Sequence, residues 1–224
     1  EIGLEPQSNI LVALSGGADS VALTLILKEL GYNVHALHCN FHLRAEESNR
    51  DEAFVEAFCQ KHQISLSVCH FQTETEARNQ SVSIEMAARE LRYTWFSELA
   101  TEENCQAIAV AHHQNDQAET ILLNLKRGTG LRGLCGMRPK SANPMGGRVP
   151  VIRPLLCTTR DYIEHYLRDI RKLTWVDETT AQNSSLALWT ATVSSGKVKF
   201  VNGSGQILTF NYSIGYKAVF NCTV

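Results

Sequence analysis

The sequence predicts an α/β fold in which a parallel sheet is covered by helices on both faces, and three observations support it. Short apolar runs alternate with longer amphipathic segments between residues 9 and 171. Glycine or polar turns separate these segments, as they do in consecutive β–α–β units. The chain has 224 residues and 44% apolar content, enough for one sizeable core plus a small appendage.

The first half of the chain is expected to run strand, helix, strand, helix, strand over residues 9–14, 21–30, 33–38, 45–62 and 64–70. The apolar run NILVAL is typical of a buried strand. The first helix is expected to stop before Gly31, a residue that suits a helix C-terminus. Phe54 and Phe58 are four residues apart, which places them on one side of the second helix.

The second half is expected to run helix, strand, helix, edge strand, helix over residues 82–101, 107–111, 116–126, 150–155 and 158–171. A glycine-rich loop, 128–147, precedes the edge strand. Thr158 and Asp161 resemble a capping box that opens the last helix. An apolar stripe on the 82–101 helix is expected at Ala88, Leu91, Trp95 and Leu99.

The composition changes at about residue 184, which predicts one domain over 1–183 and a β-rich tail over 184–224. Residues 1–183 carry a net charge of −5, whereas the tail carries only three lysines and no acid. The segments KVKFV, QILTF and YKAVF alternate in polarity or are aromatic, and turn residues separate them. This composition is typical of β-hairpins.

The turn SGGADS, Ser15–Ser20, predicts a phosphate site. Glycines let backbone N–H groups approach oxyanions, and the start of the following helix adds unpaired donors and partial positive charge. The usual ATPase loop has a lysine that reaches the β- and γ-phosphates, and this turn has none. Its absence favours a grip on pyrophosphate that leaves the α-phosphorus open to attack. Asp19 is the natural Mg²⁺ ligand, and an ordinary glycine-rich turn is the alternative reading.

Two further polar clusters, residues 38–44 and 112–116, follow predicted strands. Because ligands bind beyond the carboxyl ends of parallel strands, these clusters and SGGADS are expected to form one crevice. Glu85, Arg89 and Arg92 are spaced along one helix face, where they can meet an anion or simply be solvated. Asp116 and Glu119 share the start of a helix, where a carboxylate binds a metal, accepts a proton or complements the helix dipole.

The turn SGGADS resembles the pyrophosphate loop of N-type ATP pyrophosphatases, the PP-loop superfamily, which implies a Rossmann-like, adenine nucleotide alpha hydrolase-like domain. LHCNFHLR, EMAARELRYTWF, AHHQNDQAETILLNLKRGTGLRGLCGM and RPLL resemble the motifs of one member family, the tRNA(Ile)-lysidine synthetases. The resemblance covers roughly residues 9–177. One departure is that Phe41 stands where the family pattern has its second histidine, with His42 one place later.

The resemblance implies a ligase that forms a carbon–nitrogen bond. It would use ATP and Mg²⁺ to adenylate the wobble cytidine of isoleucine tRNA and join free lysine to it, releasing pyrophosphate and AMP. It implies catalytic roles for Asp19, Asp116, Arg89 and Arg92, with Asp19 and Asp116 as metal ligands. The nucleotide would contact Ser15, Gly16, Gly17, Ala18, Asp19, Ser20, His38 and Asn40. The tRNA or lysine would contact Arg44, Glu85, His112, Glu119, Arg127 and Arg132.

Other observations limit this reading. Eight basic residues and no acid occur from Lys126 to Arg160, which suits either a tRNA-facing patch or a solvated loop. Zinc binding by His38 and His42 or by His112 and His113 is an alternative, although the sequence has no H-E-x-x-H or C-x-x-C pattern. The seven scattered cysteines and the lack of a long apolar run favour a cytoplasmic protein with no membrane partner.

Rival functions are a tRNA thiolase, an amide-forming synthetase such as NAD synthetase, or a non-catalytic ATP- or RNA-binding remnant. The lack of paired cysteine motifs argues against the thiolase, and the basic stretch argues against the amide-forming synthetase. TWVDETTAQNS matches the family only in part, and no arginine follows Arg171. A truncation or fusion after that point is therefore one reading, which favours the remnant. The oligomeric state stays open, with a homodimer as one possibility.

Overall fold

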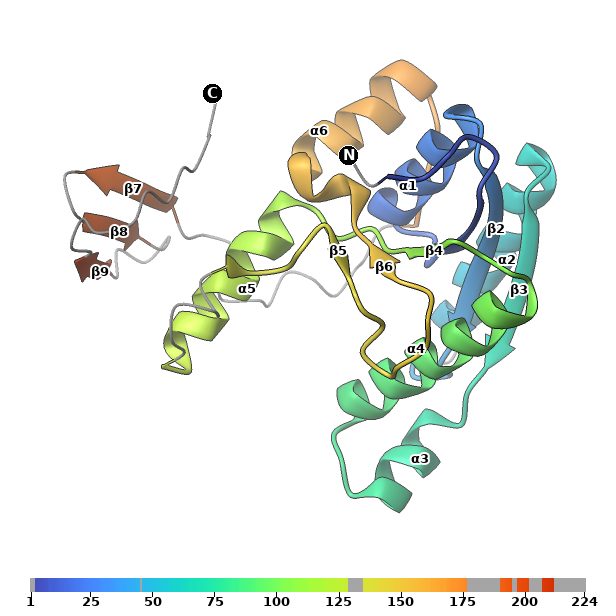
Figure 1. Cartoon of the computed structure of the whole chain (residues 1–224), viewed down its shortest axis with the longest axis horizontal. Coiled ribbons are helices and arrows are strands. Elements are labelled where there is room, and N and C mark those ends of the chain that lie inside the picture. The colour runs from blue at the N-terminus through green and yellow to red at the C-terminus, as the bar shows by residue number, and fades with distance from the viewer. Residues whose placement is uncertain are drawn as a thin grey trace. The chain divides into compact units, whose positions relative to one another are not determined.

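The computed structural model describes residues 3–44, 46–128 and 135–176, together with three strands between 190 and 211 (Figure 1). The chain forms two compact units, Glu1–Glu178 and Thr179–Val224. The domain boundary predicted at 183/184 lies outside the described residues. In the parts of the chain that are described, no helix is both long enough and apolar enough to span a membrane.

The first unit contains a six-stranded sheet in the order β3-β2-β1-β4-β6-β5. Its strands are β1 (Asn9–Ala13), β2 (Asn33–Asn40), β3 (Ser65–His70), β4 (Ala107–Ala109), β5 (Lys140–Ser141) and β6 (Val151–Ile152). β1 pairs in parallel with both β2 and β4, and only β5 is antiparallel. The strand order reverses between β1 and β4, and such a switch point opens a crevice at the carboxyl ends. The predicted fold class is confirmed.

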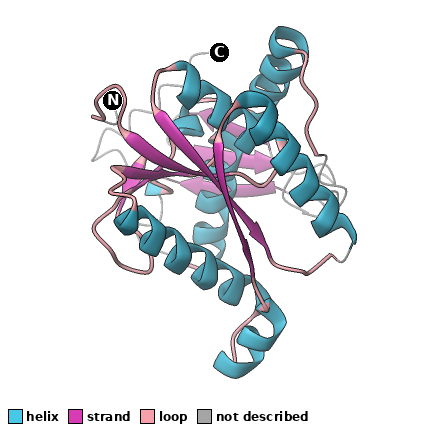
Figure 2. Ribbon diagram, turned by 90° about the vertical axis from the view of Figure 1, so that its right-hand side faces the viewer, coloured by secondary structure: helices cyan, strands magenta, loops and turns pink. Residues whose placement is uncertain are grey.

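Helices lie on both sides of this twisted sheet (Figure 2). They are α1 (Ala18–Glu29), α2 (Glu46–His62), α3 (Thr73–Gln80), α4 (Ile84–Glu102), α5 (Gln114–Lys126) and α6 (Arg160–His165). Side chains of β1 alternate between two cores because successive strand residues point to opposite faces. Ile10 and Val12 pack with α1, α2 and α6, whereas Leu11 packs with Tyr93 and Phe96 of α4. The apolar run of β1 therefore contributes side chains to the cores on both faces of the sheet.

The predicted edge strand 150–155 is wrong in position and length. β6 covers only Val151–Ile152, and it lies inside the sheet between β4 and β5. The edge strand β5 comes from the segment predicted as loop 128–147, of which residues 129–134 lie outside the description. Pro154 ends β6 and opens a 3₁₀ turn, η2 (Pro154–Cys157). Because proline has no N–H to donate to a sheet, the strand cannot continue.

Three other expectations about helices are corrected. Thr159, not Thr158, caps α6, and its hydroxyl accepts a hydrogen bond from the Tyr162 N–H. The predicted helix 158–171 divides into α6 and a π-helical segment, η3 (Tyr166–Arg171). On α4 the fully buried stripe runs through Tyr93, Phe96 and Ala100, and Leu99 and Trp95 pack only at its border.

The second unit contains a three-stranded antiparallel sheet in the order β7-β8-β9. Its strands are β7 (Thr190–Ser194), β8 (Lys197–Val201) and β9 (Ile207–Asn211). β8 is the segment KVKFV, and β9 covers most of QILTF, so the first two predicted strands form as a hairpin. The third predicted segment, YKAVF, lies outside the described residues.

Candidate active site

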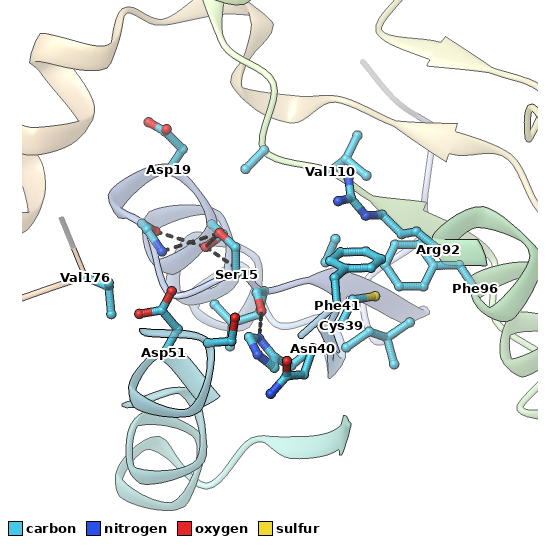
Figure 3. Close-up of a pocket in the computed structure, with 18 of the residues that line it drawn as sticks. Ser15, Asp19, Cys39, Asn40, Phe41, Asp51, Arg92, Phe96, Val110 and Val176 are labelled. Carbon is cyan, nitrogen blue, oxygen red and sulfur yellow. Dashed lines mark hydrogen bonds between the residues drawn. The ribbon is translucent and has the colours of Figure 1, made fainter. Parts of the chain in front are cut away.

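A pocket of about 470 Å³ opens at the carboxyl ends of β1, β2 and β4. Its lining includes residues from the turn after β1, the segment after β2 and the segment after β4, so the three predicted polar clusters do meet there. Ser15 and Asp19 lie toward one end of the pocket, and Phe41, Arg92 and Phe96 lie toward the other (Figure 3). A ligand that fills the pocket would therefore contact a polar loop at one end and an aromatic, cationic wall at the other.

The turn after β1 presents the start of α1 to the pocket without a side-chain cap. Gly17 is the N-cap residue, and the first backbone bond runs from the Val21 N–H to the Gly17 carbonyl. The N–H groups of a helix's first turn have no intrahelical acceptor, and they carry the positive end of the helix dipole. A glycine cannot satisfy them with a side chain. This arrangement suits the binding of an oxyanion.

The hydroxyl of Ser20 holds the turn in shape from within. It accepts hydrogen bonds from the Ser15 and Gly16 N–H groups at 3.2 Å each, and it donates to the Gly17 carbonyl at 2.9 Å. A second brace comes from the Val176 N–H, which donates to the Gly16 carbonyl at 3.0 Å. These contacts favour a role for Ser20 in fixing the loop geometry.

The two glycines of the turn meet different physical demands. Gly16 has φ +98°, and a Cβ there would lie 3.4 Å from Phe54, Val55 and Val176. Gly17 has φ −69°, which any residue adopts, and a Cβ would meet only Ser15 Oγ at 3.6 Å. Because the fold itself does not require glycine at 17, the missing side chain leaves room for a group in the pocket.

We expect Gly16→Ala to lower the free energy of unfolding by roughly 1–2 kcal/mol because alanine is strained at positive φ. Gly17→Ala is expected to leave stability nearly unchanged and to weaken ATP binding. Urea unfolding and equilibrium binding of ATP check the pair, each variant serving as the other's control. Unaltered ATP affinity in Gly17→Ala would contradict a close approach of phosphate at this residue.

Asp19 lies in the first turn of α1 and has one oxygen that fits a metal ion. Its Oδ2 accepts a hydrogen bond from Arg160 Nη1 at 3.2 Å and lies 3.6 Å from His113 Nε2. Its Oδ1 is buried and has no hydrogen-bond partner among the described residues. A buried carboxylate oxygen without a donor is a favourable ligand for Mg²⁺, which binds one or two carboxylates together with phosphate oxygens.

Asp116 acts as a helix cap and lies outside the lining of the pocket. Its Oδ2 accepts the His113 N–H at 2.8 Å, while His113 Nδ1 accepts the Asn115 N–H at 3.2 Å. The two residues thus form a reciprocal cap at the start of α5. Asp116 is also 3.5 Å from His113 Nδ1, and its charge opposes the lowering effect of burial on the pKa of both His112 and His113. Its influence on the pocket is therefore electrostatic.

The neighbouring histidines respond to their surroundings in opposite directions. Burial and three arginines, led by Arg153, lower the pKa of His112, and only Asp116 opposes them. Burial also lowers the pKa of His113, but Asp19 and Asp116 outweigh it, and the net pKa is raised. His112 lines the pocket. In the pH range between the two pKa values, His112 is neutral and His113 is positively charged.

This difference can be measured by NMR titration of the imidazole protons. We expect His112 to titrate below 6.5 and His113 above it. The contribution of His113 to stability is full below its unfolded pKa and is lost as the pH rises through the folded value. Replacing His113 by Gln should therefore destabilise the protein more at about pH 6 than at about pH 8. A larger loss at the higher pH would contradict this assignment.

Two arginines from α4 make the far wall of the pocket positive. The guanidinium of Arg92 lies over the Phe41 ring at 5.1 Å, and that of Arg89 lies over the Tyr93 ring at 5.2 Å. Arg153, the residue after β6, is buried outside the pocket lining and donates from Nη1 to the Arg138 carbonyl and to Ser141 Oγ at 3.0 Å each. Its Nε has no hydrogen-bond partner among the described residues. This wall favours an anion or a stacked base.

The segment after β2 is tied down by its own polar groups. His38 Nδ1 is 2.9 Å from the Leu14 carbonyl and donates a hydrogen bond to it. Asn40 donates to Glu52 at 2.7 Å and accepts the His42 N–H at 3.0 Å. His42 has φ +52° and stacks on His70, outside the lining of the pocket. Phe41 takes the lining position instead.

The pocket contains most but not all of the predicted site residues. Lining it are Ser15, Gly17, Asp19, Ser20, His38, Asn40, Arg44, Arg89, Arg92 and His112. Outside the lining lie Gly16, Ala18, Glu85, Asp116, Glu119 and Arg127, the last at the C-cap of α5. Arg132 lies outside the described residues.

Among the described residues, no group of three His, Cys, Asp or Glu side chains could hold a metal ion alone, which gives the zinc alternative no support.

Sequence reasoning missed several residues that line the pocket. Three of them lie on helix segments for which no motif is recognised: Arg160, Asp51 and Ser48. Three others lie within the quoted motifs but are not predicted as site residues: Phe41, Tyr93 and Phe96. The signal for Phe41 was the motif position at which it replaces histidine. For Arg160 the local sequence carried no signal, because the pairing with Asp19 spans 141 residues.

Comparisons with known proteins agree with this geometry. Residues 2–187 match the family described as the PP-loop domain. Proteins named tRNA(Ile)-lysidine synthase are 51% identical in Bacteroides thetaiotaomicron over 80% of this chain and 41% identical in Clostridium perfringens over 77%. The chain spans 40% and 36% of the length of these two relatives, respectively.

One solved structure resembles the fold at low sequence identity. It is described as the U34-tRNA thiolase NcsA from Methanococcus maripaludis with its [4Fe-4S] cluster. The TM-score is 0.61 at 21% identity, and the match covers 78% of this chain and 60% of the other. At this identity the likeness supports the α/β architecture and says nothing of the reaction.

Proposed function

The chain belongs to the PP-loop domain family, whose members use ATP, and on that premise we propose that it is the adenylating domain of a tRNA(Ile)-lysidine synthase. Its substrates would be ATP, the wobble cytidine of an isoleucine tRNA and free lysine. Because the chain spans about 40% of such relatives, the activity of the whole enzyme is part of the proposal. The observation that carries it is the single pocket shared by the three motif segments.

The proposed reaction has two steps. First, the 2-oxygen of cytidine bonds to the α-phosphorus, the bond between that phosphorus and the bridging oxygen breaks, and pyrophosphate leaves with the electron pair. Second, the lysine amine bonds to C2 of the base, the C2–O bond breaks, and AMP leaves. Adenylation thus turns a poor leaving oxygen into a good one. Codon reading would change from AUG to AUA.

The residues of the first step would act mainly by positioning and by electrostatics. The uncapped start of α1 at Gly17 binds the β- and γ-phosphates through N–H donors, and Ser20 holds the loop that presents them. Asp19 would hold Mg²⁺, which when bound neutralises charge on the leaving pyrophosphate. Arg89 and Arg92 would stabilise charge near the α-phosphorus, where fixed donors lower the barrier most.

The second step requires a neutral amine and a proton acceptor. Asp116 is the sequence-based choice, but its carboxylate already caps His113 and lies outside the pocket lining. His112 lines the pocket, and its lowered pKa keeps it neutral. We therefore assign proton acceptance to His112, with Asp116 stabilising the imidazolium that results. In this assignment Asp116 contributes to proton transfer only through its negative charge.

The thiolase rival needs a reactive thiolate in the pocket. Cys39 lines the pocket and is the strand partner of Cys69, the nearest approach to a cysteine pair among the described residues. Burial raises the pKa of Cys39 to about 12, against the opposing effect of Arg92, and burial also raises the pKa of Cys69. Reactive cysteines need a lowered pKa, so this pair does not favour thiolation.

Lysine incorporation tests the proposed function. Radiolabelled lysine, ATP and Mg²⁺ are incubated with an isoleucine tRNA that carries a CAU anticodon, with methionine tRNA of the same anticodon as control. Label is expected in the isoleucine tRNA alone. Adenylation without lysine transfer would restrict the proposal to the first step. We also propose that the basic residues between Lys126 and Arg160 contact the tRNA, that free lysine binds in the same pocket, and that the protein is cytoplasmic.

A further inference from the structure

Arg160 lines the pocket, and the function described so far gives it no role. It lies at the first position of α6, and its side chain is 34% exposed. Nη1 donates to Asp19 Oδ2 at 3.2 Å, and Nε donates to Glu164 Oε1 at 3.0 Å. The guanidinium therefore bridges the PP-loop carboxylate and a carboxylate on its own helix.

The contact with Asp19 competes with the role assigned to that carboxylate. A guanidinium and a divalent cation on one carboxylate lie within a few ångströms of each other, and like charges at that distance repel strongly at a partly buried site. His113 Nε2 lies 3.6 Å from the same Asp19 oxygen. Binding of a metal ion at Oδ1 thus weakens the hold of Asp19 on Arg160.

The hydrogen bond to Glu164 keeps Arg160 at the pocket when its ion pair with Asp19 breaks. Glu164 holds the Nε edge of the guanidinium, one turn along α6, and is itself 3.6 Å from Arg168. Rotation about this edge moves the Nη atoms while the residue stays in place. Arg160 lines the same pocket as Ser15 and Gly17, where a leaving pyrophosphate would lie, and it contacts Asp19 of that loop. A planar guanidinium offers two parallel donors to such an anion.

We propose that Arg160 exchanges Asp19 for the pyrophosphate group when metal and nucleotide bind, and so senses that the site is loaded. In the empty pocket Arg160 neutralises Asp19. In the loaded pocket it contacts the β- and γ-phosphates and stabilises the charge that develops as pyrophosphate leaves. This inference rests on the proposed function, because it requires pyrophosphate to be the leaving group.

The simpler reading is that the ion pair only tethers α6 to α1. An ion pair at this exposure contributes little to stability, and a tether would not discriminate between ligands of opposite charge. The exchange predicts changes of opposite sign in one variant. Removing Arg160 eliminates the competitor of the metal and also removes a donor to the anion.

Two binding measurements on the whole chain test this. Mn²⁺ replaces Mg²⁺ and is followed by electron paramagnetic resonance, and magnesium pyrophosphate is titrated by calorimetry. In Arg160→Ala we expect Mn²⁺ affinity to rise roughly three- to tenfold and pyrophosphate affinity to fall about 10- to 100-fold. Arg160→Lys should recover part of the pyrophosphate affinity. Arg78→Ala, which breaks an exposed pair with Glu74 on α3, should change neither.

Each outcome distinguishes the exchange of Arg160 between Asp19 and pyrophosphate from a tether of α6 to α1. Equal pyrophosphate affinity in wild type and Arg160→Ala overturns the exchange and leaves the proposed function standing. A parallel fall in both affinities, with a lowered melting temperature, assigns Arg160 to the tether and also overturns it. A wild-type chain that binds neither ATP nor pyrophosphate overturns the proposed function itself, and the exchange with it.

Discussion

Asp19→Asn is expected to lower tRNA-dependent exchange of pyrophosphate into ATP by about 10²–10³-fold, the size seen when a fixed electrostatic contact to a transition state is lost. The change keeps the shape of the side chain and removes its charge. The buried Oδ1, which has no partner among the described residues, then no longer attracts a metal ion. Arg160 also loses the carboxylate that it neutralises.

The measurement is the exchange rate at saturating ATP and Mg²⁺, with Asp169→Asn as the matched control. Asp169 pairs with His165 and its side chain is 53% exposed, so the same chemical change there should leave the rate unaltered. Circular dichroism verifies that both variants fold. A rate in Asp19→Asn above half that of the wild type would contradict the role of Asp19.

Asp116→Asn is expected to reduce lysidine formation by about 10²-fold or more, the usual size of a general-base contribution. The amide oxygen of asparagine can still accept the His113 N–H, so the cap of α5 survives while the negative charge disappears. Without that charge the imidazolium of His112 is less stable, so His112 accepts the proton of the amine less readily. Pyrophosphate exchange, which reports only adenylation, should fall much less.

Asp116→Ala serves as the comparison because it removes both the charge and the cap, and it should cost about 1 kcal/mol of stability in addition. Single-turnover lysine transfer to pre-adenylated tRNA isolates the second step. Lysidine formation at the wild-type rate in Asp116→Asn would exclude Asp116 from proton transfer and leave it only the cap.

The sequence predicted the elements of the first unit best where periodicity was strong and long. The apolar strands β1 to β4 and the helices α1, α2, α4 and α5 form near their expected positions. Helix α3 was missed because TETEARNQ has no apolar stripe; only Thr73 and Ala77 are buried. The two-residue strands β5 and β6 are defined by their partners across the sheet, which local patterns do not encode.

The site was predictable to the extent that it follows from topology. Once the strands are parallel, their carboxyl ends meet, and the clusters at Ser15, His38 and His112 must converge. What the sequence could not reveal depends on contacts between distant residues. The pairing of Arg160 with Asp19 arises only when α1 and α6 lie together. The opposite pKa shifts of His112 and His113 depend on burial and on charges from other elements, such as Arg153 and Asp19.

The central claim is that the loop from Ser15 to Ser20 grips pyrophosphate while the α-phosphorus is attacked. Cleavage of ATP by the chain, followed with label in the α- and γ-positions, tests it directly in the presence of isoleucine tRNA. The account predicts pyrophosphate and α-labelled, adenylated tRNA as products without lysine, and AMP once lysine is added. Exchange of labelled pyrophosphate into ATP is expected to require this tRNA and not to require lysine. Production of ADP and orthophosphate, or ATP binding without any exchange, would contradict it.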